Sequence, residues 1–128
     1  MAFEQGAGAG MHDEDEYRIE RYISQFGLPL GKGRKYLKRM LTLSIQNKDC
    51  LDCNSFIKQI ADEQGVTCTT IKQGISRFLL RGWKRGAAQG WRKAAHWEKD
   101  DLPNTMAAMT LICERYPQFI EIDGENVN

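Results

Sequence analysis

Apolar residues recur along most of this chain at the three- and four-residue spacing of amphipathic helices. The pattern predicts helices over about residues 13–26, 32–46, 54–64, 68–85 and 105–116, and a short helix or structured loop over 91–97. The alternation typical of strands is nearly absent. We therefore expect an all-α fold, a compact bundle of five or six helices.

The segment from Asn54 to Arg85 predicts two helices joined by a tight turn. Asn54 or Ser55 is expected to cap the first helix, and Gly65 to end it in a left-handed conformation. We expect Val66 to enter the core and Thr67 to cap the second helix through its hydroxyl. A capped pair of this kind is typical of a helix-turn-helix that binds DNA, although an ordinary helical hairpin with a solvated polar face stays open.

The second helix of this pair has one apolar and one polar face. Its apolar positions, predicted to pack inward, are Ile71, Ile75, Phe78 and Leu79. A rotation of about 100° per residue places on the opposite side Thr69, Thr70, Gln73, Arg77 and Lys84. Gln73 can pair with adenine and Arg77 with guanine or a phosphate, so this face is predicted to read bases in the major groove.

Charge is strongly sorted along the chain. The net charge is only +1, but residues 21–97 hold fifteen Lys or Arg against four acids, a net of +11, and both ends are acidic. A basic block gains affinity for DNA by releasing counterions from the phosphates. Cations near a helix N-terminus oppose the dipole of that helix, which favours an external anion at 32–35. The predicted phosphate contacts are Lys32, Arg34, Lys35, Arg39, Arg81, Lys84 and Arg85; a basic domain with no polyanionic partner is the alternative.

Length and composition indicate one globular domain. The chain has 128 residues, 41% of them hydrophobic, and no apolar run near the ~20 residues that span a bilayer. It shows no signal-peptide pattern, so we expect a cytoplasmic protein with no membrane contact. The predicted organisation is a disordered segment over 1–12, the helical domain over 13–117 and an acidic tail over 118–128.

Catalytic and metal chemistry are poorly represented. His96 is accompanied by no nucleophile, carboxylate pair or phosphate-binding loop, so we expect no enzyme and no cofactor. Cys50 and Cys53 form a C-x-x-C without a second pair at zinc-site spacing. No metal site is predicted, although metal binding by this pair is left open. Cys68 and Cys113 are expected to be small buried hydrophobic residues.

Several short motifs follow one another in a fixed order between about Tyr17 and Tyr116. They are Gly27-Leu28-Pro29, Gly33 with Tyr36 and Leu37, Ile60-Ala61 before Thr67, Ile71 with Ile75, and Trp83-Lys84-Arg85-Gly86. In this order they resemble the C-terminal DNA-binding domain of the stage-zero sporulation master response regulator. The resemblance implies an all-helical, helix-turn-helix domain that binds short promoter boxes on double-stranded DNA, as a homodimer or as tandem copies.

The positions that read bases depart from this family. Where the family has Arg, Glu and Arg, this chain has Thr70, Lys72 and Gln73, and Arg77 replaces a His. The resemblance thus adds Lys72 to the base-reading candidates and implies a different target sequence. Few residues precede the first predicted helix, so we expect a stand-alone domain without a receiver. The alternative is an interaction module that has lost specific reading and modulates a related regulator.

Overall fold

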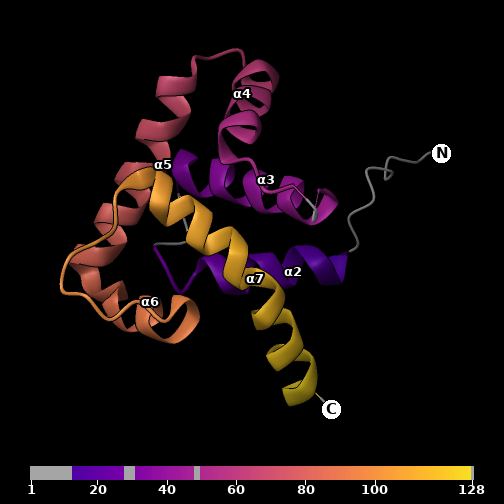
Figure 1. Ribbon diagram of the computed structural model, residues 1–128, viewed down its shortest axis with the longest axis vertical. Coiled ribbons are helices and arrows are strands. Elements are labelled where there is room, and N and C mark those ends of the chain that lie inside the picture. The colour runs from indigo at the N-terminus through magenta and orange to yellow at the C-terminus, as the bar shows by residue number, and fades with distance from the viewer. Residues whose placement is uncertain (1–12, 28–30, 48–49, 128) are drawn as a thin grey trace.

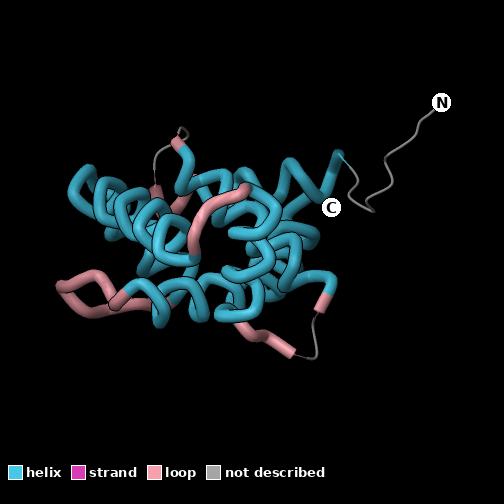
Figure 2. The backbone as a smooth tube through the Cα atoms, turned by 90° about the horizontal axis from the view of Figure 1, so that it is seen from above, coloured by secondary structure: helices cyan, strands magenta, loops and turns pink. Residues whose placement is uncertain are grey.

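The computed structural model describes residues 13–27, 31–47 and 50–127, and its regular structure in these ranges is entirely helical (Figures 1 and 2). The elements are α2 (Asp13–Ile23), α3 (Lys32–Gln46), α4 (Cys53–Gln64), α5 (Cys68–Gly82), a π-helical turn (Trp83–Ala87), α6 (Ala88–Ala95) and α7 (Thr105–Val127). The predicted all-α class is confirmed. None of the helices in the described ranges is both long and apolar enough to cross a lipid bilayer.

Local side chains set the ends of α4 and α5. Asp52 caps α4, since its carboxylate accepts a hydrogen bond of 3.2 Å from the backbone N–H of Ser55. The prediction of Asn54 or Ser55 as the cap was therefore wrong, because Asp52 supplies a stronger, charged acceptor just upstream. Gly65 ends α4 with a left-handed φ of 68°, as predicted. The Thr67 hydroxyl accepts a 3.1 Å hydrogen bond from the N–H of Thr70 and caps α5, which confirms that prediction.

The turn between α4 and α5 lies at the surface. Val66 is 36% exposed and Cys68 is exposed, so the predictions that placed both in the core were wrong. The turn projects at the far end of the α4–α5 pair, away from the centre of the bundle where the other helices meet (Figure 1). The pair is instead anchored by the buried faces of its two helices.

The core is centred where α2, α3, α5 and α7 meet. Tyr22 of α2 is fully buried and donates a 2.6 Å hydrogen bond to the carbonyl oxygen of Ile112 in α7. Burial raises the pKa of Tyr22 far above its usual value, so the hydroxyl stays protonated as a donor. Trp91 of α6 is also fully buried and packs edge-to-face on Phe26, with 4.8 Å between ring centroids. α2 ends at Ile23, earlier than predicted, but Phe26 is buried as expected.

The C-terminal end differs most from its prediction. α7 does not stop at Tyr116 but continues through Pro117 to Val127, so the acidic tail predicted over 118–128 is largely helical. Phe119 explains the extension, because its ring lies 5.1 Å from that of Tyr22 and 6.3 Å from that of Tyr116. These contacts hold the helix to the core beyond the proline. The segment predicted to be disordered, 1–12, lies outside the described residues.

Two glycines allow α3 and α5 to cross in close contact. A Cβ atom on Gly33 of α3 would overlap the backbone carbonyl oxygen of Gly74 in α5. A Cβ on Gly74 would in turn lie 2.9 Å from the ring of Tyr36. The crossing fixes how far α5 stands from α3 and which side of α5 is left facing solvent.

Candidate nucleic-acid interface

α5 carries the two faces that its sequence predicts. Ile71, Ile75, Phe78 and Leu79 are buried against the bundle, which confirms the apolar face. The exposed residues on the other side form what we call the outward face of α5: Thr69, Thr70, Gln73, Arg77, Leu80 and Arg81. Lys72 lies at its margin and is partly buried. The predicted base-reading residues are therefore brought together on one helix, four of them exposed.

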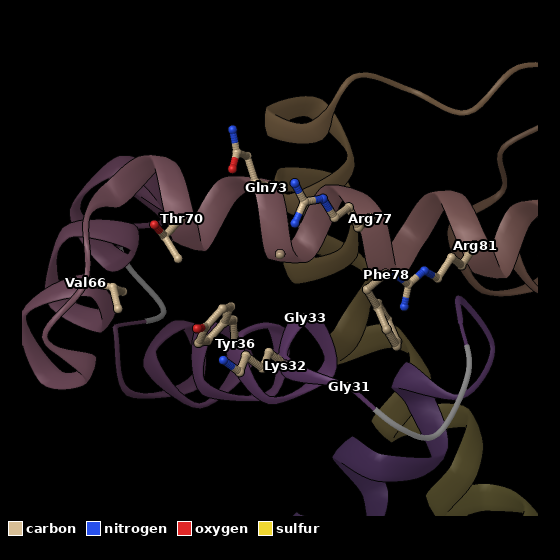
Figure 3. A pocket seen from close by; sticks show the side chains of 11 residues that line it. Gly31, Lys32, Gly33, Tyr36, Val66, Thr70, Gln73, Arg77, Phe78 and Arg81 are labelled. Atoms are coloured by element: carbon tan, nitrogen blue, oxygen red, sulfur yellow. The ribbon is translucent and has the colours of Figure 1, made fainter.

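A groove of about 340 Å³ runs between α5 and the N-terminal part of α3 (Figure 3). Its polar lining comes from Lys32 and Tyr36 of α3 and from Thr70, Gln73, Arg77 and Arg81 of α5. None of the described residues that line it is acidic. Phe78 points from α5 toward α3, whereas Gln73 points away from α3 (Figure 3). The α3–α5 groove is thus a cationic hollow beside the outward face.

Most polar groups of the outward face are not engaged within the described part of the chain. Gln73, Arg77 and Arg81 make no hydrogen bond or ion pair with any described residue. Thr70 differs, because its hydroxyl lies 3.0 Å from that of Thr67, the α5 cap. No described residue thus uses the hydrogen-bonding groups of Gln73 and Arg77, and these groups can pair with a ligand.

Two more cations extend this surface past the end of α5. Lys84 and Arg85 are exposed in the π-helical turn and make no ion pair with a described residue. Gly86 follows with a φ of 107°, a conformation that favours glycine and ends the helical path. The predicted phosphate contacts at 81, 84 and 85 are therefore exposed together at the C-terminal end of α5.

Arg34 is not a surface cation. It is 8% exposed, and its guanidinium donates to the Glu20 carboxylate at 2.5 and 3.1 Å, to the Glu20 carbonyl at 3.0 Å and to the Ser24 hydroxyl at 3.1 Å. Hydrogen bonding to Arg34 holds the pKa of Glu20 below its usual value. The prediction of Arg34 as a phosphate contact was wrong, because the Arg34 side chain is buried and ion-paired with Glu20 of α2.

Arg39, another predicted phosphate contact on α3, is also neutralised inside the bundle. Arg39 donates to both carboxylate oxygens of Glu63, at 2.9 and 2.7 Å, and this hydrogen bonding raises the pKa of Arg39. Lys35 lies 3.4 Å from the side-chain oxygen of Gln64. Acids of α2 and α4 thus supply the anions that pair with Arg34 and Arg39. Lys32 differs, since it lines the groove and has no partner in the described ranges.

Two residues of this surface were missed from the sequence. Leu80 is 43% exposed on the outward face, seven residues after Gln73, and that spacing could have placed it there. Tyr36 was identified only as a family match, but it lines the α3–α5 groove opposite α5 (Figure 3). No sequence signal reveals the groove itself, because it depends on how the two helices cross.

Among the described residues, no group of three or more His, Cys, Asp or Glu side chains is arranged to hold a metal ion.

Comparison of the chain with protein families, with curated proteins and with solved structures found no match.

Proposed function

We propose that this protein is a sequence-specific DNA-binding transcription regulator that places α5 in the major groove. The observation that carries the proposal is the outward face of α5. Its Gln73, Arg77 and Arg81 are exposed and unengaged, whereas Arg34 and Arg39 of α3 are ion-paired within the bundle. An exposed row of donors, beside a groove whose described lining holds no acid, is suited to a polyanion.

Each part of this surface has a distinct chemical task in the proposal. Gln73 pairs with the edge of adenine, and Arg77 pairs with guanine or with a flanking phosphate. Lys32 and Arg81, beside the groove, bind phosphates that position the helix without reading sequence. Lys84 and Arg85 extend these contacts along the same strand. α5 has 15 residues, about 22 Å at 1.5 Å per residue, enough to lie along a major groove.

The proposal includes the role implied by the resemblance to the sporulation regulator. In it, α4 and α5 act as a helix-turn-helix, and the protein works in the cytoplasm without enzymatic activity. Two copies, as a homodimer or in tandem, would occupy neighbouring boxes on double-stranded DNA. Because Thr70, Lys72 and Gln73 replace the family's reading residues, the boxes would differ in sequence from those of the family.

Selection of bound fragments from sheared genomic DNA tests this function. The wild-type protein should enrich a short common motif, and the Gln73→Ala, Arg77→Ala double variant should lose it. Arg39→Ala is a matched control, since it removes a cation that is paired with Glu63. If wild-type protein enriches no motif and retains only salt-sensitive background binding, the interaction-module alternative replaces the proposal.

A further inference from the structure

Two cysteines that lie far apart in the sequence meet between α4 and α7. Cys53 is the first residue of α4, Cys113 lies in α7, and the two are 6% and 2% exposed. The hydroxyl of Thr110, one turn before Cys113, donates to the Cys53 sulfur at 3.6 Å. Thr110 and Cys113 lie one turn apart on α7, and both cysteine side chains are buried where α4 packs on α7. The Cys53 side chain therefore packs on the part of α7 that carries Cys113.

This contact separates the two halves of the C-x-x-C motif. Cys50 is exposed before α4 begins, whereas Cys53 turns inward toward α7. Cys68 is exposed at the start of α5. Cys113, and not the exposed Cys50 that the sequence suggests, is therefore the cysteine buried with Cys53 where α4 packs on α7.

The two thiols are chemically unequal. Hydrogen bonding from Cys113 and from Thr110 lowers the pKa of Cys53 to about 7, and the N-terminal end of α4 also favours a thiolate there. Hydrogen bonding to Cys53, together with burial, raises the pKa of Cys113 well above its usual value. At neutral pH a large fraction of Cys53 is then thiolate beside a protonated Cys113, which is the arrangement of an attacking and a resolving cysteine.

We propose that Cys53 and Cys113 are a redox-active pair that peroxides oxidise to an intramolecular disulfide. The Cys53 thiolate attacks one peroxide oxygen, the O–O bond breaks, and Cys53 becomes a sulfenic acid as the first water leaves. The Cys113 sulfur then attacks the Cys53 sulfur, the S–O bond breaks, and the thiol proton leaves with hydroxide as the second water. The two sulfurs together lose two electrons to the peroxide, and a small-molecule dithiol reverses the reaction.

The disulfide would change the fold in one defined way. It would bond the first residue of α4 covalently to α7, and so close a loop of the chain that contains all of α5. Opening of α4 away from α7 would then be blocked in the oxidised protein and allowed in the reduced protein.

The test uses the full chain with Cys50→Ser and Cys68→Ser, which leaves the buried pair in place. After treatment with hydrogen peroxide and alkylation of remaining thiols, the two free thiols should fall to none. Peptide mass mapping should show one Cys53–Cys113 cross-link that dithiothreitol removes. Adding Cys113→Ser should abolish the cross-link and leave Cys53 as a sulfenic acid that dimedone labels.

In the wild-type protein Cys50 is also present and can compete with Cys113 for a disulfide with Cys53. The linkage between Cys53 and Cys113 should exceed any Cys50–Cys53 linkage. A predominant Cys50–Cys53 disulfide would overturn the proposal. So would failure of the double variant to cross-link while circular dichroism shows it folded.

Discussion

Gly33 of α3 and Gly74 of α5 meet backbone to backbone, since a Cβ on Gly33 would overlap the Gly74 carbonyl oxygen. Tyr36 completes this crossing by packing against Gly74. The contact sets the position of α5 on the bundle and forms one wall of the α3–α5 groove. The presentation of the outward face thus depends on two residues that have no side chain.

Gly33→Ala is expected to destabilise the fold. Alanine favours a helix by about 1 kcal/mol over glycine, but overpacking against the fixed backbone of α5 costs about 1–3 kcal/mol or more. The free energy of unfolding, measured in urea, should therefore fall. Lys32→Ala, one residue earlier and exposed, is the control and should leave stability nearly unchanged. Equal stability of Gly33→Ala and wild type would contradict the close crossing.

Arg34→Ala should lower stability rather than weaken DNA binding specifically. Loss of its charged hydrogen bonds to Glu20 and Ser24 should cost about 1–3 kcal/mol, near the lower end because the Glu20 side chain is 38% exposed. Arg81→Ala, at an exposed position without a described partner, should weaken DNA binding and leave stability nearly unchanged. Thermal unfolding and DNA affinity, measured on both variants below their melting temperatures, separate the two roles. An Arg34→Ala variant of normal stability and weakened DNA binding would restore Arg34 as a phosphate contact.

Stability should fall in acid partly through Glu20. Its pKa in the folded protein is below the usual value of 4.5, so its contribution is complete above that value and is lost as the pH falls through the lower folded pKa. Glu20→Gln should therefore show a shallower loss of melting temperature between pH 6 and pH 3 than wild type. Glu98→Gln, at an exposed loop position, is the control. Parallel curves for Glu20→Gln and wild type would count against the Glu20–Arg34 pair.

Phe119→Ala tests whether the C-terminal part of α7 belongs to the core. The ring packs on Tyr22 and Tyr116 but is only partly buried, so the expected loss is about 1–3 kcal/mol, less than for a fully buried Phe. Calorimetry on the full chain gives this value, with exposed Glu121→Ala as the control. A melting temperature equal to wild type would support the predicted tail instead.

Local signals in the sequence predicted much of the helical framework. Three features were set by nearby residues, each within about one helical turn. They are the bounds of α3, the left-handed Gly65 and the Thr67 cap. The apolar face of α5 likewise follows from helical spacing alone. These features were predicted correctly because no distant contact overrides them.

Features that depend on packing between helices were missed. Arg34 meets Glu20 and Arg39 meets Glu63 only because three helices are brought together, so spacing along α3 could not reveal either pair. The packing of Cys53 against Thr110 of α7, one turn before Cys113, arises in the same way. Phe119 lies beyond a proline that normally ends a helix, and only its contacts with the core explain why α7 continues.

The most direct test of DNA binding by the outward face of α5 compares Arg77→Ala with Arg39→Ala on a selected DNA duplex. Fluorescence anisotropy over a range of salt concentrations gives the affinity and its salt dependence. Arg77→Ala should weaken binding about tenfold or more, with a salt slope reduced by about one if Arg77 contacts a phosphate, because an unpaired contact is lost. Arg39→Ala should stay within about twofold of wild type, since Glu63 already neutralises that cation. Equal loss of affinity in both variants, or none in Arg77→Ala, would contradict binding through this face.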